Sequence, residues 1–329
     1  MKCPYCFKSS SIRYNLRKGS RLVNYCMYCK SEIPLQYYES EDTEYTRIAT
    51  LGYSGHGKTS WAVSLLYVLK AMNAHWDGFF IETLDDNSHD ALYNDVSDLE
   101  QGKPLAPTPA IFPHPVFFRL NNIPVFSQRF VGLFDTGGRL FENLDLMTKK
   151  GRFYTQASAV FFFISLAEDD MLDIWNMKIM KLLDRYINVV YSRYGLKTAK
   201  KQSIAFVFTK PSLLQNMKDK FRLTPDIESI LQSGTIENFA ELNGRFLERI
   251  KLNSDKIEEW LRKNDCNSFI NHAKSNFKNV AFFITSALGQ LPADDKVVKK
   301  FSLKDPKCVL DPLLWALSIS GNGKIMSIG

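Results

Sequence analysis

The sequence predicts an α/β fold in which helices cover both faces of a mostly parallel sheet, with a small cysteine module in front. Two observations carry this prediction. From residue 46 onward, short apolar segments alternate with longer segments whose apolar residues recur at helical spacing. One apolar segment, residues 159–166, is almost free of polar side chains, which is typical of a central strand buried on both faces. Strands that alternate with helices in this way indicate a parallel sheet.

The individual elements follow from the same patterns. Asn121-Asn122 is a good hairpin turn between two apolar segments, so one antiparallel hairpin is expected at an edge of the sheet. Residues 77–110 have several prolines near their end and are expected to be irregular. The expected strands are residues 47–53, 116–120, 125–134, 159–166, 203–208 and 280–285. The expected helices are residues 58–72, 171–194 and 312–318, and helical patterns are expected through residues 226–263.

The composition is that of an ordinary globular protein. The chain has 329 residues, enough for one large core and a small appendage, and its 45% of hydrophobic and 23% of charged residues give no reason to expect a long disordered region. No apolar stretch reaches the roughly 18–20 residues that a membrane span needs, and the first residues lack the apolar core of a signal peptide. We therefore expect a cytoplasmic protein that does not contact a membrane.

Four cysteines near the N-terminus form two Cys-x-x-Cys pairs, Cys3 with Cys6 and Cys26 with Cys29. Two such pairs on either side of a hairpin can place four thiolates tetrahedrally around one Zn²⁺. A redox function is disfavoured because no βαβ pattern surrounds either pair. We expect a zinc ribbon at residues 1–38 with strands at 11–17 and 21–25, an acidic linker at 39–45, and a single α/β domain at 46–329.

Most of the excess positive charge lies in this ribbon. Its 38 residues contain seven basic groups and one acid, a net charge of +6, whereas the whole chain carries +7. The rest of the protein is therefore close to neutral and gives no case for nucleic-acid binding along its whole surface. The ribbon itself, which is rich in tyrosine, is expected to bind either nucleic acid or another protein.

Residues 52–59 match the pattern G-x-x-x-x-G-K-[ST] in full and lie between an expected strand and an expected helix. Glycines let the backbone fold around phosphate groups, and the positive end of the helix faces the same anion. Lys58 is expected to reach the β- and γ-phosphates, and the Thr59 hydroxyl to coordinate Mg²⁺. The residues of this segment expected to contact a nucleotide are Gly52, Ser54, Gly55, His56, Gly57, Lys58, Thr59 and Ser60.

A second motif follows the apolar segment 125–134. Asp135 stands at the end of this expected strand and can hold Mg²⁺ through water, while Gly138, three residues later, can offer its N–H to the γ-phosphate. Taken with the loop 52–59, the residues 135–138 resemble the third motif of TRAFAC-class (Ras-like) P-loop GTPases. The resemblance extends from residue 47 to the C-terminus and implies a P-loop NTPase fold with bound GTP or GDP.

Further roles come from this resemblance. Thr108 occupies the place of the threonine that closes over the γ-phosphate and Mg²⁺, and Thr209 and Lys210 occupy part of a base-recognition motif. Ser286 and Ala287 match half of a second base-recognition motif. The zinc ribbon and the residues 311–315, Asp-Pro-Leu-Leu-Trp, are most similar to the bacterial double-GTPase group. That group implies a companion GTPase or another defence-system subunit as partner.

Two positions depart from the family pattern. Ser212 replaces the acid that pairs with guanine, so ATP remains an alternative ligand. Arg139 stands where the family has a water-positioning glutamine, and it either stabilises transition-state charge or caps the next helix. Three functions thus remain open: a GTP-hydrolysing switch that is slow without a partner, an ATP-using protein, and a nucleotide-stabilised scaffold whose ribbon does the binding.

Overall fold

The structure is a computed structural model that describes residues 2–9, 12–18, 21–40, 43–103, 105, 115–138, 144–150, 152–167, 172–211, 214, 223–241, 244–289, 303 and 305–320. A small sheet near the N-terminus contains β1 (Ile12–Lys18), β2 (Arg21–Cys26) and β3 (Glu32–Ile33). The main sheet contains β4 (Tyr45–Leu51), β5 (Phe80–Thr83), β6 (Val116–Ile123), β7 (Ser127–Phe134), β8 (Ala159–Ser165), β9 (Ser203–Thr209) and β10 (Asn279–Thr285). The helices are α1 (Leu35–Glu39), α2 (Lys58–Met72), α3 (Asp86–Asp90), η1 (Ala91–Asp95), α4 (Val96–Glu100), α6 (Leu144–Lys150), α7 (Arg152–Thr155), α8 (Leu172–Tyr194), α9 (Leu196–Ala199), α10 (Pro225–Ser233), α11 (Ile236–Phe239), α12 (Gly244–Lys263), α13 (Asn267–Asn276) and α14 (Asp311–Ser320).

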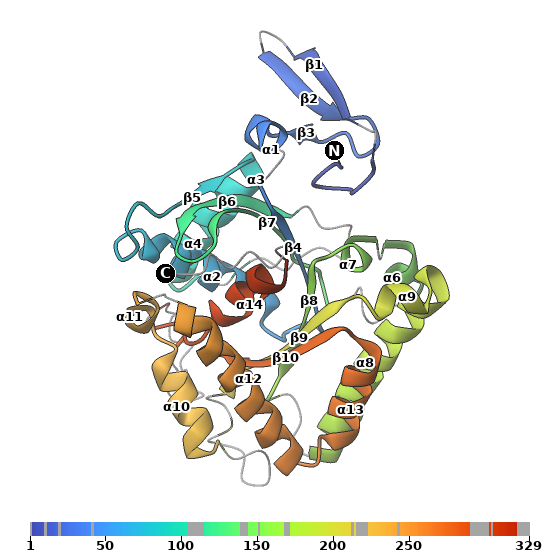
Figure 1. Cartoon of the computed structure of the whole chain (residues 1–329), viewed down its shortest axis with the longest axis vertical. Coiled ribbons are helices and arrows are strands. Elements are labelled where there is room, and N and C mark those ends of the chain that lie inside the picture. Colours follow the sequence, from blue (N-terminus) through green and yellow to red (C-terminus); the bar gives the residue numbers. More distant parts are fainter. Residues whose placement is uncertain are drawn as a thin grey trace.

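The main sheet has seven strands in the order β10-β9-β8-β4-β7-β6-β5, with helices on both faces (Figure 1). Every neighbouring pair is parallel except the two pairs that include β6. The expectation of a mostly parallel α/β sheet with an antiparallel hairpin is therefore confirmed. Because β4, β7, β8, β9 and β10 run parallel to one another, their carboxyl ends meet at one edge of the sheet.

The central strands are apolar because both of their faces are covered. In β8, Val160, Phe162 and Ile164 belong to one buried cluster, while Phe161 and Phe163 belong to the other. This division follows from the alternation of side chains along a strand. Helices α8, α10 and α13 cover the first cluster, and α2, η1, α4 and α14 cover the second; α12 contributes to both.

The prediction that residues 77–110 are irregular is wrong for most of the part that the structure describes. Strand β5 extends the sheet beyond β6, and the short helices α3, η1 and α4 follow it. Local capping starts this helical run, since the Asp85 carboxylate accepts hydrogen bonds of 2.8 Å from the Ser88 N–H and 2.7 Å from the Ser88 hydroxyl. Burial of Leu92 and Leu99 then holds the run against α2.

Two smaller corrections concern the hairpin and α13. The turn between β6 and β7 falls at residues 124–126 rather than at Asn121-Asn122, because the strand register shifts between Leu120 and Ile123. Asn122 still has a positive φ of 52°, so the residue type signals the local backbone correctly but not the end of the strand. Helix α13 lies in a polar stretch that gave no signal in the sequence.

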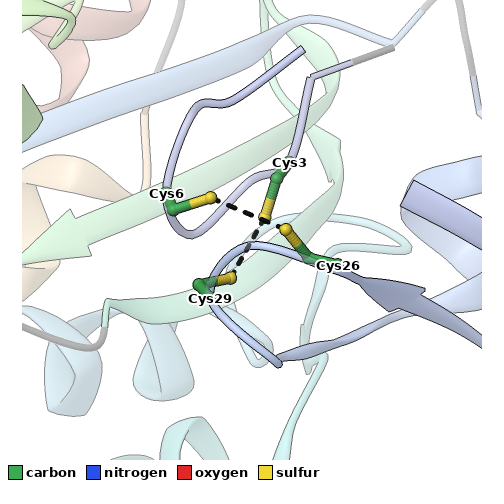
Figure 2. Close-up of side chains that lie close together, drawn as sticks. All are labelled: Cys3, Cys6, Cys26 and Cys29. Carbon is green, nitrogen blue, oxygen red and sulfur yellow. Dashed lines mark hydrogen bonds between the residues drawn. The ribbon is translucent and has the colours of Figure 1, made fainter. Parts of the chain in front are cut away.

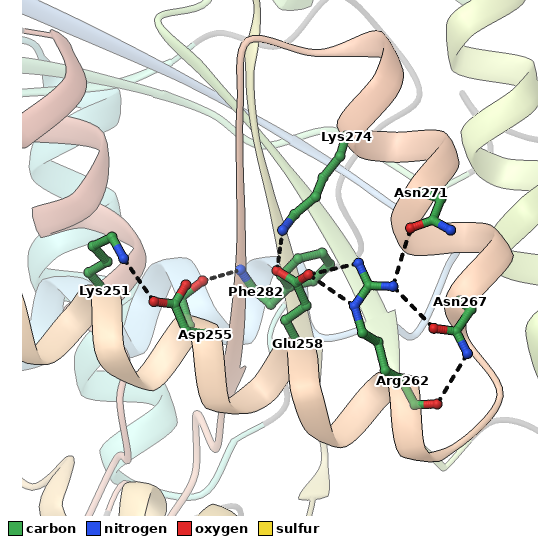
Figure 3. Close-up of polar contacts among 9 residues, drawn as sticks. Lys251, Asp255, Glu258, Arg262, Asn267, Asn271, Lys274 and Phe282 are labelled. Atoms are coloured by element: carbon green, nitrogen blue, oxygen red, sulfur yellow. Dashed lines mark hydrogen bonds and ion pairs between the residues drawn. The ribbon is translucent and has the colours of Figure 1, made fainter.

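Polar side chains join α12 to α13 beside the sheet (Figure 3). Glu258 accepts hydrogen bonds from both Nε and Nη2 of Arg262, at 3.1 and 2.9 Å, and pairs with Lys274 at 2.5 Å. Arg262 also donates to the side-chain oxygens of Asn267 and Asn271.

Among the described residues, no helix has the length and apolar character that crossing a membrane requires.

One buried acid makes the stability of the fold depend on pH. Burial raises the pKa of Asp311, at the start of α14, to about 7, although the charge of Arg249 opposes this shift. Because the folded pKa lies above the unfolded one, this group stabilises the fold at low pH and loses that contribution as the pH rises toward 7. We therefore expect the free energy of unfolding of Asp311→Asn, relative to that of the wild type, to be about 1–3 kcal/mol higher at pH 8 than at pH 5.

Urea denaturation of both proteins at the two pH values measures this gain. Asp226→Asn, at an exposed carboxyl in an ion pair with Lys256, is the matched control and should show no comparable change. A wild-type-to-Asp311→Asn difference that is the same at pH 5 and pH 8 would contradict the raised pKa.

Candidate functional site

The glycine-rich loop connects the central strand β4 to α2 at the carboxyl edge of the sheet. Gly57 is the N-cap of α2 and has a φ of 82°, in the left-handed region that favours glycine. The first intrahelical bond runs from the Trp61 N–H to the Gly57 carbonyl, at 2.9 Å. The loop therefore leads directly into the N-terminus of a 15-residue helix. The partial positive charge at such a helix end attracts anions.

Two neighbouring strands hold the loop in this conformation. The buried His56 ring has its Nδ1 2.8 Å from the carbonyl oxygen of Phe163 on β8. The Thr209 hydroxyl at the end of β9 donates to the His56 carbonyl at 2.9 Å. The His56 side chain thus anchors the loop within the core, and any contact with a nucleotide falls to its backbone.

The Lys58 ammonium lies inside the loop. It donates to the carbonyl oxygens of Gly52 at 2.9 Å and Tyr53 at 2.8 Å, and its side chain is buried. A buried ammonium held by backbone carbonyls places a full positive charge in the concavity of the loop.

Asp135 connects the second sequence motif to this loop. Its Oδ2 accepts a hydrogen bond of 2.7 Å from the Thr59 hydroxyl, and its Oδ1 accepts one of 2.9 Å from the Thr50 hydroxyl on β4. The Thr136 hydroxyl donates to the Thr50 carbonyl at 2.5 Å, which fixes the same turn from the other side. Asp135 and Thr59, 76 residues apart, are thus brought together as the sequence predicts.

Gly138 lies directly against the loop. A Cβ added to Gly138 would be 2.1 Å from the Ser54 backbone nitrogen and 2.5 Å from its Cα. Only a glycine allows the two backbones to approach this closely, since these neighbours are backbone atoms that cannot rotate away.

The predicted base-recognition residues lie along the same edge. Thr285 pairs with Thr209 across β10 and β9, so Ser286 and Lys210 follow neighbouring strand ends. Lys210 is exposed and has a positive φ of 59°. The Ala287 carbonyl accepts a hydrogen bond of 2.8 Å from Ser64 of α2, which brings this segment against the helix that starts at the glycine-rich loop. Thr108, Arg139 and Ser212 lie outside the described residues.

Some residues of the site gave no signal in the sequence. Thr50 is one, because threonine is common in strands and its presence there indicates no particular role. Its hydrogen bond to Asp135 depends on the pairing of β4 with β7. The carbonyl of Phe163 is another, because a backbone acceptor leaves no trace in a residue pattern.

The cysteine module brings four thiols together (Figure 2). The Sγ atoms of Cys3 and Cys29 are 3.7 Å apart, those of Cys6 and Cys26 are 3.6 Å apart, and all four lie within 4.8 Å of one another. Four sulfurs at about 2.3 Å from one tetrahedral Zn²⁺ would be separated by roughly 3.8 Å. The spacing fits a zinc site, and none of the six cysteines, each in the described part, forms a disulfide.

The two Cys-x-x-Cys turns have the same backbone conformation. The Phe7 N–H donates to Cys3 O at 3.0 Å, and the Lys30 N–H donates to Cys26 O at 2.9 Å. Phe7 and Lys30, which follow the second cysteine of each pair, both have a φ of 64°. Two copies of one turn facing each other present their sulfurs to a common point, as a metal knuckle requires.

Shared protons in this cluster favour a thiolate. The hydrogen bond from Cys3 lowers the pKa of Cys29 below its usual range, while that bond and burial raise the pKa of Cys3. Burial raises the pKa of Cys6 to about 11. Metal binding would replace these shared protons, since zinc takes cysteine as thiolate.

The cysteine module packs firmly on the main sheet. Tyr5 donates to Asp85 Oδ2 at 2.8 Å, and its ring meets Phe117 of β6 edge to face at 5.8 Å. The Phe7 ring lies 5.2 Å from that of Phe134, the residue before Asp135. One buried cluster contains residues of both parts: Cys3, Tyr5, Cys6, Cys26, Ile33, Phe117 and Phe130.

No family model matches the chain, and no curated protein matches it either.

The close approach of Gly138 can be tested by substitution. Gly138→Ala should push the two backbones apart and lower the free energy of unfolding by about 1–3 kcal/mol. It should also speed amide hydrogen exchange in the peptide that contains residues 52–59. Gly195→Ala is the control, because a Cβ there meets nothing within 4 Å although its φ is +80°. It should strain its own turn and leave exchange in the loop unchanged, and unchanged loop exchange in Gly138→Ala would contradict the predicted contact.

Metal content tests the cysteine cluster. Cys3→Ser combined with Cys6→Ser should reduce bound zinc from one ion per chain to none, because two thiolates cannot complete the tetrahedral site. Cys266→Ser, at a buried thiol outside the cluster, should retain one zinc. Elemental analysis of the purified proteins gives the result, and full zinc in the double variant would disprove the site.

Proposed function

We propose that the chain binds a nucleoside triphosphate with Mg²⁺ at the loop 52–59 and acts as a nucleotide-dependent switch that hydrolyses the γ-phosphate. The observation that carries the proposal is the 2.7 Å hydrogen bond between Thr59 and Asp135. A hydroxyl at the start of the helix and a carboxylate from an adjacent strand are the two protein groups that hold Mg²⁺ in P-loop NTPases. Both are oxygen donors, which Mg²⁺ prefers.

The other groups of the site have complementary roles. The Lys58 ammonium would exchange its carbonyl acceptors, Gly52 and Tyr53, for phosphate oxygens. The N–H groups at the start of α2 would bind the same anion, and Gly138 lies close enough to the loop to donate its N–H toward a terminal phosphate. When bound, Mg²⁺ would offset the charge on the phosphate oxygens.

Guanine is the proposed base, and adenine is the specific alternative. Lys210 and the segment at Ser286 and Ala287 follow adjacent strand ends, which supports a base site beside the loop. The sequence places Ser212 where GTPases have an acid, which removes a charge-assisted contact to guanine and favours the ATP alternative. Hydrolysis is proposed to be slow, with Arg139 in place of glutamine and Thr108 as the residue that closes over the γ-phosphate.

The contact between the cysteine module and the sheet supports the switch. Phe7 follows a zinc-site cysteine and packs on Phe134, whose neighbour Asp135 belongs to the nucleotide site. A movement of Asp135 when diphosphate replaces triphosphate would therefore be transmitted to the module through the contact between Phe134 and Phe7. We propose a structural Zn²⁺ in the module and a protein partner, such as a companion GTPase, whose assembly depends on the bound nucleotide.

Calorimetry with non-hydrolysable GTP and ATP analogues, with and without Mg²⁺, tests the proposal. We expect the GTP analogue to bind more tightly than the ATP analogue, and Mg²⁺ to strengthen binding. Lys58→Ala should weaken binding at least about tenfold, since it removes a charge-assisted contact to phosphate. Lys70→Ala, an exposed lysine on the same helix, should bind as the wild type does.

Each result decides a different part of the proposal. Binding of neither analogue would refute nucleotide binding, and tighter binding of the ATP analogue would replace guanine by adenine. Turnover no higher than that of Lys58→Ala in the presence of Mg²⁺ would leave a binding protein without hydrolysis.

A further inference from the structure

We infer that the exposed turn of the cysteine module binds single-stranded nucleic acid, with Tyr28 as the stacking residue and Lys8 and Lys30 as phosphate contacts. The inference does not depend on the proposed nucleotide site.

The two Cys-x-x-Cys turns share one backbone conformation but face different surroundings. In the first, Tyr5 is 4% exposed and packs against Phe117 of the main sheet. In the second, Tyr28 occupies the equivalent position, before the second cysteine, and is 62% exposed. Met27 beside it is also exposed, at 38%. One turn therefore attaches the module to the protein, and its counterpart presents the same aromatic residue to solvent.

Positive charge lies beside the exposed tyrosine. The Lys8 ammonium lies 4.8 Å from the centre of the Tyr28 ring, and Lys30 is exposed two residues further on. The adjoining hairpin of β1 and β2 carries more basic residues and extends away from the main sheet (Figure 1). Its basic residues are Arg13, Arg17, Lys18 and Arg21.

The net charge remains positive with a metal bound. Residues 1–38 carry +6, and Zn²⁺ with four thiolates would contribute about −2, which leaves roughly +4. A surface of this charge attracts polyanions and releases their counterions on binding.

The combination of groups favours single strands over a duplex or an acidic protein. An exposed aromatic ring offers a stacking surface to an unpaired base, and stacking on aromatic side chains is the main sequence-independent contact to single strands. Lysines next to the ring can contact the phosphates on either side of that base. In a duplex the bases already stack on one another, and an acidic protein has no need of the ring.

Fluorescence anisotropy with labelled single strands of about 20 nucleotides, longer than typical sites of 4–16 nucleotides, tests the inference on the full chain. We expect binding that weakens with salt, and duplex of the same length to bind less tightly. Tyr28→Ala should weaken single-strand binding about 5- to 100-fold through loss of stacking. Lys8→Glu with Lys30→Glu should weaken it further and reduce the dependence on salt.

Matched variants in α9 and at Lys200, the residue after it, provide the controls and are called the α9 controls. Leu196→Ala removes an apolar side chain that is 50% exposed, and Lys197→Glu with Lys200→Glu reverses two exposed lysines. Both should bind single strands as the wild type does. Zinc content and the affinity for GTP analogue should be unchanged in Tyr28→Ala, which shows that the fold is intact.

Three outcomes would overturn the inference. They are no binding of single strands by the wild type, equal losses in the α9 controls, and wild-type affinity in Tyr28→Ala. Polyglutamate that binds as tightly as the single strand, and loses affinity equally in the charge-reversed variant, would instead identify an acidic protein as the partner.

Discussion

The carboxylate of Asp135 is the point on which the arrangement of this protein depends. It accepts hydrogen bonds from Thr50 on the central strand and from Thr59 at the start of α2, so one side chain directly after β7 fixes both the strand and the helix. The glycine-rich loop between them is then held from three directions: by Asp135, by the buried His56 and by the close backbone of Gly138. Parallel pairing of β4 with β7 makes this possible, because it brings both strand ends to the same edge.

The cysteine module is attached to the rest of the protein by aromatic residues of its first turn. Tyr5 and Phe7 lie in the first Cys-x-x-Cys turn and contact Asp85 and Phe134, which belong to two separate segments of the chain. Burial raises the pKa of Tyr5, and the nearby Asp85 carboxylate adds to this, so the phenol stays a donor in its bond to Asp85. A small module with little core of its own is thereby fixed by aromatic packing as well as by its thiols.

Much of this could be predicted from the sequence, and the failures have physical causes. Strong periodicity placed β8 and α2, since long apolar patterns are unambiguous, and the motif at residues 52–59 placed Lys58 and Thr59 at one edge of the sheet. Segments with weak periodicity were missed, among them β5, α3, η1, α4 and α13, because short elements owe their structure to capping and tertiary contacts. The docking of Tyr5 could not be predicted, since nothing in Cys-Pro-Tyr-Cys distinguishes a buried tyrosine from the exposed Tyr28 of the second turn.

The shared aromatic cluster has a consequence for how the protein can be divided. Phe117 and Phe130 of the main sheet are fully buried, and part of their cover is Tyr5 and Tyr37 from the N-terminal forty residues. Cutting the chain ahead of β4 would leave an exposed aromatic surface on the larger fragment and deprive the smaller one of Phe117 and Phe130, against which it packs. The two modules are separate in the order of the chain but share one buried cluster. Fragments divided between them would each expose apolar surface and would therefore tend to aggregate.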